Sequence, residues 1–347
     1  MRKIILLLLI FSFISPVVVN ATEYTAPNAP EKAQKYIPDE NVSFADGLWY
    51  IIRTAIADLQ PNVADAAVIC TSVIAITLLI SIMQTFDGPT KVTVTLVGTI
   101  AIAALLFKDS NTMMHLASDT VQDLSEYGKL LLPVMTGALA AQGGLTTSAA
   151  LYAGTLLFNT LLSTLISGLL IPMVYFYIAI SVADNAVPDN ALKNLGKLLK
   201  WLITWTLKII LYTFTGYIGI TGVVSGSADA MAIKAAKIAI SGAVPVVGSI
   251  ISDASETILV SAGVIKNAAG IAGMFAIIAV WIGPFLKIGV QYILLKLTAA
   301  VSGIFGSKQC VSMIKEFSVA LGLMLAMTGT ICLLHIVSTV CFMKGLS

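Results

Sequence analysis

The chain has 347 residues, of which 58% are hydrophobic and 11% are charged, with a formal net charge of +2 and a mean hydropathy of +0.94. Soluble domains carry about 25% charged residues, so this composition excludes an ordinary soluble protein. It predicts an all-α polytopic integral membrane protein. The small net charge, without a basic patch interleaved with aromatic residues, argues against a nucleic-acid partner.

Residues 1–21 have the pattern of a signal peptide, in which basic residues precede an apolar run and small residues end the segment at Ala21. We expect cleavage after Ala21; an uncleaved anchor is the alternative. Residues 22–62 would then be exported as a short polar tether. Apolar residues recur at helical spacing in Ser43–Leu59, which predicts a helix on the membrane surface.

Residues 63–347 are predicted to form a multipass membrane domain, because apolar runs close to the ~20 residues of a bilayer span recur along them. The predicted spans lie near 66–83, 92–107, 145–183, 207–224, 268–304 and 317–343. Pro172 interrupts one of these runs and Gly283-Pro284 interrupts another. Whether each interrupted run holds one span or two stays open.

Broken helices are expected at two places, and Leu130–Ala141 is the first. This apolar segment is too short to span a bilayer and ends at Gln142-Gly143-Gly144, so it predicts a half-helix or re-entrant segment. The preceding Asp109–Lys129 is polar and rich in acidic residues, and we expect it to be a linker outside the membrane.

Ala191–Lys208 is the most basic stretch, and its lysines fall on one face of a helical wheel. This pattern predicts an in-plane amphipathic helix on the cytoplasmic leaflet, with its basic face against anionic lipid. A docking face for a cytoplasmic protein is the alternative. The basic face consists of Lys193, Lys197, Lys200 and Lys208.

Ser241–Gly270 contains the second expected break. The hinge residues Gly242, Pro245 and Gly248 argue against an unbroken helix, because proline removes a backbone donor and glycine costs conformational entropy. A helix capped by acidic residues should follow and should carry one narrow polar stripe. This candidate lining or contact surface consists of Ser249, Asp253, Glu256, Gly263 and Asn267.

Motifs for catalysis or cofactor binding are absent from the sequence. It has no Walker motif, no G-x-S-x-G, no H-E-x-x-H and no cysteine pair with metal-ligand spacing. We therefore expect no enzymatic activity, no cofactor and no metal. His335 lies in the last predicted span, where we expect a hydrogen-bonded packing group rather than a catalytic one.

The order of these features resembles the stage III sporulation protein AE family over nearly all of the mature chain. The most specific segments are Leu131-Leu132-Pro133 followed by Gly143-Gly144, then Ser241–Thr257 and Lys266–Gly270. The resemblance implies a multipass protein of the mother-cell side (outer forespore) membrane with an exported N-terminus. It implies no catalytic residues.

The resemblance also implies partners. These are the other proteins of the stage III sporulation A operon, including a secretion-type ATPase and ring-forming proteins, and a forespore channel partner. We expect a membrane-embedded component of the channel that links mother cell and forespore. The alternatives are a polytopic secondary transporter or permease, and a non-conducting scaffold of the channel complex.

Overall fold

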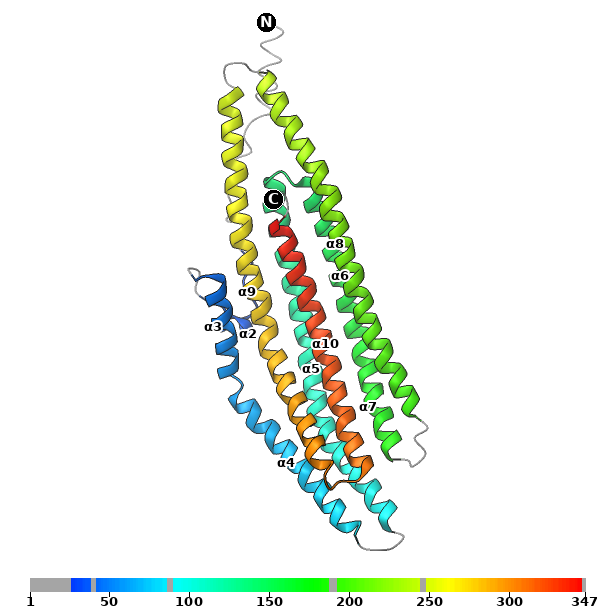
Figure 1. Ribbon diagram of the computed structural model, residues 1–347. Helices are drawn as coiled ribbons and strands as arrows, with labels where there is room; N and C mark the ends of the chain where they lie inside the picture. The colour runs from blue at the N-terminus through cyan, green and yellow to red at the C-terminus, as the bar shows by residue number, and fades with distance from the viewer. Residues whose placement is uncertain (1–25, 39–41, 86–89, 187–191, 244–247, 345–347) are drawn as a thin grey trace.

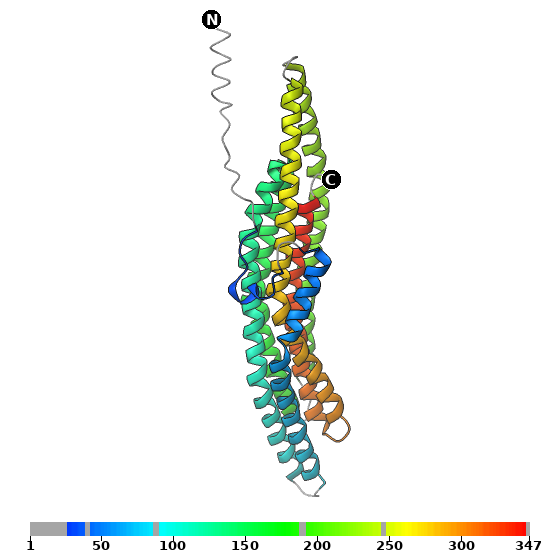
Figure 2. The same cartoon turned by 90° about the vertical axis from the view of Figure 1, so that its left-hand side faces the viewer.

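The computed structural model describes residues 26–38, 42–85, 90–186, 192–243 and 248–344, without the side chains of 90–92 and 222–266. Throughout this part the chain is helical, apart from short connections, and no strand occurs in it. Figures 1 and 2 show an elongated bundle of long helices that run side by side. Its helices are α2 (Glu31–Gln34), α3 (Phe44–Ala57), α4 (Gln60–Met83), α5 (Thr90–Ala141), α6 (Leu145–Leu165), η1 (Ile166–Leu170), α7 (Ile171–Ala186), α8 (Lys193–Ala243), α9 (Gly248–Ser302) and α10 (Lys308–Lys344).

Six helical segments among the described residues are long and apolar enough to cross a membrane. Many of their large apolar side chains are exposed, which suits contact with lipid rather than water. The predicted all-α, polytopic class is therefore confirmed. The segments are Gln60–Met83, Thr93–Ala141, Leu145–Ala186, Lys193–Thr221, Asn267–Ser302 and Lys308–Lys344.

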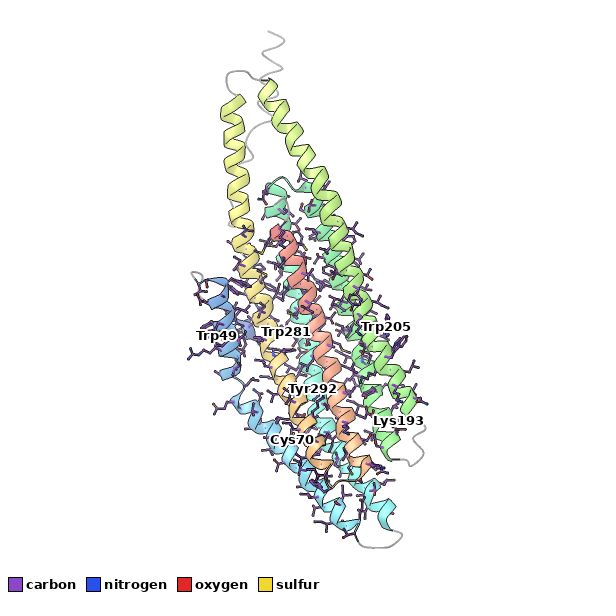
Figure 3. The ribbon with its side chains drawn as sticks, in the orientation of Figure 1. Trp49, Cys70, Lys193, Trp205, Trp281 and Tyr292 are labelled. Carbon is purple, nitrogen blue, oxygen red and sulfur yellow. The ribbon has the colours of Figure 1, made fainter. Side chains whose placement is uncertain are left out.

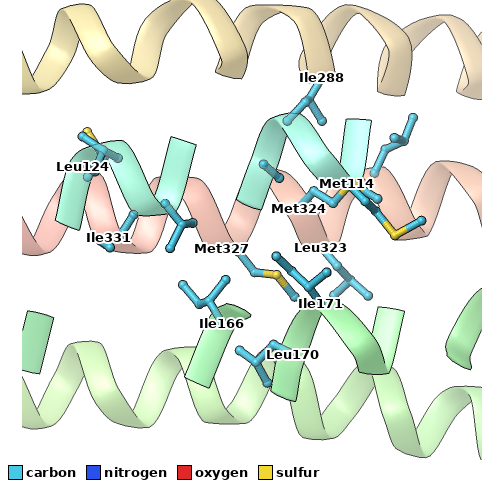
Figure 4. Packing of buried hydrophobic residues seen from close by; sticks show 14 of the residues in the cluster. Met114, Leu124, Ile166, Leu170, Ile171, Ile288, Leu323, Met324, Met327 and Ile331 are labelled. Atoms are coloured by element: carbon cyan, nitrogen blue, oxygen red, sulfur yellow. The ribbon is translucent and has the colours of Figure 1, made fainter. Parts of the chain in front are cut away.

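Helix α10 lies at the centre of the bundle and packs against α5 and α9, with α6, α7 and α8 also in contact. Large apolar side chains fill the space on its inward-facing side. They include Met324, Met327 and Ile331, which are all fully buried. Figure 4 shows these residues meeting Met114 of α5 and Ile166 and Leu170 of η1. Methionine fills irregular gaps well, so the centre of the bundle is a packed apolar core.

Helix α5 contains three segments that were predicted separately. The predicted span 92–107, the expected acidic linker Asp109–Lys129 and the expected half-helix Leu130–Ala141 are parts of one helix of 52 residues. Pro133 lies inside that helix. Proline is tolerated in membrane helices because groups on neighbouring helices can bond the backbone carbonyl that it leaves free. The linker and the re-entrant segment were therefore wrong.

The end of α5 was recognisable from its glycines. Gly143 has φ 99°, a conformation that glycine adopts without strain. Its N–H bonds to the carbonyl of Ala140, and the N–H of Gly144 bonds to the carbonyl of Leu139. This pair of bonds is the Schellman motif, which satisfies the last carbonyls of a helix. The Gly-Gly pair thus marks the turn from α5 into α6.

The predicted in-plane helix Ala191–Lys208 is also corrected, because Lys193 begins α8, which continues without a break to Ala243 along the bundle. The face opposite the lysines buries Leu199 and Ile203. That face packs on α7, so tertiary contact holds this segment in line with the other helices.

The two prolines of the interrupted runs also lie within helices. Pro172 follows the π-helical turn η1, which connects α6 and α7 into one continuous run. Such a turn accommodates a local disruption of the helical hydrogen bonds. Pro284 lies inside α9, which continues to Ser302. Each run therefore forms one long helical segment rather than two spans.

Helix α3 occupies the predicted helical segment Ser43–Leu59, and the Ser43 side chain caps its start by accepting a hydrogen bond from the Asp46 N–H at 3.2 Å. It packs along α9, where the rings of Phe44 and Phe275 stack with centroids 5.4 Å apart. Its location at a membrane surface stays a prediction.

Candidate functional site

The predicted hinge falls between two long consecutive helices, α8 with 51 residues and α9 with 55. Gly242 lies in the last turn of α8 and Gly248 begins α9, whereas Pro245 lies outside the described residues. Figure 1 shows the end of α8 and the start of α9 projecting beyond the other helices. The two helices therefore form a long hairpin, and bending at the hinge stays a prediction.

The predicted polar stripe lies on the second arm of this hairpin, within the backbone of α9. Because α9 begins at Gly248 and has no acidic residue in its first turn, the expected capping of this helix by acidic residues was wrong. Asn267 is exposed. The side chains of the other members, Ser249, Asp253 and Glu256, and the surroundings of Gly263 are outside the described set. The stripe stays a predicted lining or contact surface.

The basic face on α8 is exposed at all four positions, Lys193, Lys197, Lys200 and Lys208. Trp201 and Trp205 are exposed beside it, and their ring centroids are 6.0 Å apart. Figure 3 shows Lys193 and Trp205 pointing away from the bundle. This combination of lysine and tryptophan suits a lipid headgroup region, because indole rings favour that depth.

A buried polar cluster connects α5, α6 and α10 inside the apolar core. Its members come in pairs one helical turn apart, so each helix directs two of them to the same side. We call this set the polar cluster. It consists of Ser125 and Gly128 of α5, Thr155 and Asn159 of α6, and His335 and Ser338 of α10.

Direct contacts join the three helices at this cluster. Asn159 Nδ2 donates to the carbonyl of Ser125 at 3.1 Å, and Asn159 is fully buried. The hydroxyls of Thr155 and Ser338 lie 2.7 Å apart and share a hydrogen bond. Hydrogen bonds of this kind help to fix the register of apolar helices, which otherwise slide past one another with little cost.

His335 packs directly against the backbone of α5. An ideal Cβ built on Gly128 would lie 2.0 Å from His335 Cε1, so glycine is what allows the imidazole ring to reach this depth. His335 is 3% exposed, and its Nε2 has no hydrogen-bond partner among the described residues. The histidine is therefore a packing group, as expected, but one ring nitrogen is not hydrogen-bonded.

Two further polar atoms of the cluster lack a hydrogen-bond partner within the described part of the chain, namely Ser125 Oγ and Asn159 Oδ1. Unpaired buried polar groups cost about 1–3 kcal/mol each, so the cluster is a costly feature to retain in an apolar core. The sequence drew attention to His335 in the last predicted span, but not to the residues that surround it. The i, i+3 and i, i+4 spacing of the small polar residues was the missed signal.

Other polar contacts join helices in the part of the bundle away from the polar cluster. Tyr177 of α7 donates a hydrogen bond to the carboxylate of Glu316 on α10. Gln291 of α9 donates to Asp109 of α5 at 2.5 Å. Tyr175 of α7 donates to Asn111 of α5 at 2.7 Å. Each contact joins a different pair of helices, so the bundle is held by polar contacts along its length as well as by its apolar core.

A charged cleft of about 480 Å³ opens where α2 lies against α5 and α9. Its walls combine basic and acidic side chains with the backbone of α9 around Pro284. The charged residues that line it are Glu31, Lys32, Lys35, Asp58, Asp119, Asp123 and Lys287. No group of three or more histidine, cysteine, aspartate or glutamate residues suitable for a metal ion occurs within the described ranges.

The pH dependence of α2 docking follows from Asp58. The hydrogen bond from Lys35, at 2.6 Å, and then that from Tyr36 lower the pKa of the Asp58 carboxyl, and the Asp58 bond raises the pKa of Lys35. This stabilisation, about 0.2–1 kcal/mol for an exposed pair, is present above the ordinary Asp pKa of about 4 and is lost as pH falls through the lowered value. It is lost again above the ordinary Lys pKa of about 10.4, as pH rises through the raised value.

We therefore expect protease cleavage near α2 to increase towards pH 3 and to be lowest between about pH 5 and pH 9. Limited proteolysis at a series of pH values measures this. Asp58→Asn is the matched control, because it removes the titrating carboxylate. An acid-dependent increase of the same size in Asp58→Asn would contradict the assignment.

Together, the long apolar helices and the polar contacts inside the bundle define a polytopic α-helical membrane protein. Residues 33–345 match the family model of stage III sporulation protein AE, and the chain belongs to that family. The name of the family indicates a stage III sporulation protein.

One curated relative is the stage III sporulation protein AE of Bacillus subtilis (strain 168), which is 23% identical over 197 residues. The matched part is 57% of this chain and 49% of that relative, so the similarity spans about half of the relative's length. No solved structure matches the chain.

Proposed function

We propose that this protein is a membrane-embedded component of a secretion-like channel complex that links mother cell and forespore and is needed for forespore development. One observation carries the proposal: α5 has 52 residues and α9 has 55, or about 78–83 Å at 1.5 Å per residue. The hydrocarbon core of a bilayer is only about 30 Å thick. A bundle of this length supports a protein that both spans a membrane and reaches partners beyond it.

The proposed location is the mother-cell side (outer forespore) membrane, with the N-terminus exported. The proposed partners are the proteins of the stage III sporulation A operon, including a secretion-type ATPase and ring-forming proteins, together with a forespore channel partner. The exposed lysines of α8 would contact anionic lipid. Family membership supports these assignments.

A non-conducting scaffold is the second candidate, and the packed core favours it. Met324, Met327 and Ile331 are fully buried at the centre of the bundle, where large side chains meet from several helices (Figure 4). A path through the middle of one chain would require these side chains to move apart. A conduit would therefore run between this chain and its neighbours.

Alanine substitutions in the predicted polar stripe separate the two functions. We expect Asp253→Ala, Glu256→Ala and Asn267→Ala, made one at a time, to reduce spore formation strongly in sporulating cells. Spore counts measure function, and co-purification with the operon partners measures assembly. Asp65→Ala is the control, because it removes an exposed acidic side chain on α4, far from the stripe in sequence.

Loss of spores with intact assembly favours the conduit, whereas loss of both favours the scaffold. Normal spore formation and assembly in all three variants would contradict a role for these residues. Protein abundance is measured alongside, to exclude simple loss of folding.

A further inference from the structure

One face of α5 is polar along its whole middle third. At every third or fourth position this face presents an exposed polar or charged side chain, which is the spacing of one helical face. We call it the α5 stripe. It consists of Lys108, Thr112, His115, Asp119, Gln122, Glu126 and Lys129.

The length of the α5 stripe matches a bilayer. From Lys108 to Lys129 the helix rises about 32 Å, and the hydrocarbon core is about 30 Å thick. Just before the stripe, Val97, Ile100 and Phe107 are exposed and apolar, and Leu130 is exposed and apolar directly after it. The polar surface is therefore a bounded segment of an otherwise apolar helix.

Hydrogen bonds show which part of the bundle lies at the same height. Ser125 of α5 is level with Asn159 of α6, because Asn159 Nδ2 lies 3.1 Å from the carbonyl oxygen of Ser125. Asn111 of α5 is level with Tyr175 of α7, because the Tyr175 hydroxyl lies 2.7 Å from Asn111 Oδ1. The α5 stripe therefore lies at the height of the segment that joins α6 to α7.

That segment has the opposite character. Residues 145–183 contain no Asp, Glu, Lys, Arg or His. Its exposed large side chains are all apolar, which suits lipid on that side of the bundle. They are Leu145, Leu157, Leu161, Leu169 and Phe176. At this height, the exposed surface of α6 and α7 is therefore suited to lipid, whereas the α5 stripe is suited to water.

A charged side chain facing lipid at this depth costs several kcal/mol, and such residues face a bundle interior or a water-filled cavity instead. The charged cleft gives a second sign of water access. It adjoins the α5 stripe through Asp119, and Lys32 of α2 and Lys287 of α9 also line it.

The sequence of charges along the α5 stripe disfavours direct contact, without water, with the same face of a second copy. Copies inserted in one membrane have the same orientation, so a symmetric pair meeting through this face would place lysine against lysine and acid against acid. Like charges in direct contact repel, and a layer of water between them screens that repulsion.

We propose that the α5 stripe lines a water-filled space within the thickness of the membrane, while α6 and α7 face lipid. This deepens the proposed function and rests on it, because the space would be the aqueous path of the channel complex, enclosed between neighbouring subunits.

Cysteine labelling in membranes of sporulating cells tests the proposal with the full-length chain. The stripe variants are Thr112→Cys and Gln122→Cys. The matched variants at about the same heights are Phe176→Cys and Leu161→Cys on the lipid side. The probe is a membrane-impermeant thiol reagent, a charged methanethiosulfonate. Background comes from the unsubstituted protein, in which Cys70, Cys310 and Cys332 are buried and Cys341 is half-buried.

We expect both stripe variants to react at least tenfold faster than the two lipid-side variants, since a thiolate forms in water and not in hydrocarbon. Equal fast labelling of all four positions would overturn the proposal by placing this height outside the membrane. Absence of labelling in the stripe variants would also overturn it, because a partner protein or lipid would then cover the stripe. Spore counts and assembly of the same strains report on the proposed function separately, so a failure of the lining proposal leaves that function intact.

Discussion

Gly128→Ala should lower the free energy of unfolding of this protein by about 1–3 kcal/mol, the usual cost of overpacking a filled core. The added Cβ would lie 2.0 Å from Cε1 and 2.6 Å from Nδ1 of His335, closer than any real contact allows. The ring is 3% exposed and enclosed by α5, α6 and α10, so it has little room to move. Thermal unfolding of the purified protein in detergent measures the change.

A double-mutant cycle identifies the ring as the cause. His335→Ala removes the obstacle, so Gly128→Ala should cost much less in that background, with a coupling of about 0.5–3 kcal/mol. Gly329→Ala on α10 is the matched control, because its added Cβ meets nothing within 4 Å. That change should be neutral or stabilise the helix by up to about 1 kcal/mol. Additive effects of the first two substitutions would contradict the contact.

Much of the architecture was predictable from local pattern. The apolar runs correspond to the six described helical segments that are long and apolar enough to cross a membrane, and the class follows from them. The Gly143-Gly144 pair marked the end of α5, because one of its residues requires positive φ. Ser43–Leu59 was recognisable as a helix from its apolar spacing, and the structure adds Ser43 as its cap.

The errors have one common cause, which is packing between helices distant in sequence. Pro284 indicates a break when its segment is considered alone, but α9 continues through it, as α5 continues through Pro133, with neighbouring helices packed alongside. The acidic part of α5 was predicted to be a linker because its charges suggest water. The structure places it level with apolar helices, and α5 continues through it.

The polar cluster shows the same limit. Asn159 and His335 are 176 positions apart in sequence (335 − 159), and no local pattern states that they lie in one cluster. Gly128 gave no signal at all, since glycine inside a helix usually marks a weak point. Its role depends on the one ring that packs against it. Pairing across helices, rather than periodicity within one, creates this cluster.

Tyr177→Phe should destabilise the bundle by about 1.5–3 kcal/mol, because it removes a hydrogen bond to the carboxylate of Glu316 and leaves that group half-buried and without this donor. The penalty is larger in hydrocarbon than in water, since no solvent replaces the lost donor. Tyr212→Phe is the matched control: Tyr212 is 70% exposed, and its change should stay within about 0.5 kcal/mol.

Changing Glu316 and changing Tyr177 should lower the free energy of unfolding by different amounts. Glu316→Gln keeps an oxygen that accepts the Tyr177 hydrogen bond, so it should cost less than Tyr177→Phe. The double variant Tyr177→Phe/Glu316→Leu removes both polar groups and should recover most of the lost stability, because an apolar pair of similar volume needs no hydrogen bond. Unfolding in detergent compares the four proteins. If the double variant were as unstable as Tyr177→Phe alone, the loss would come from packing at α7 and α10 rather than from an unpaired carboxylate.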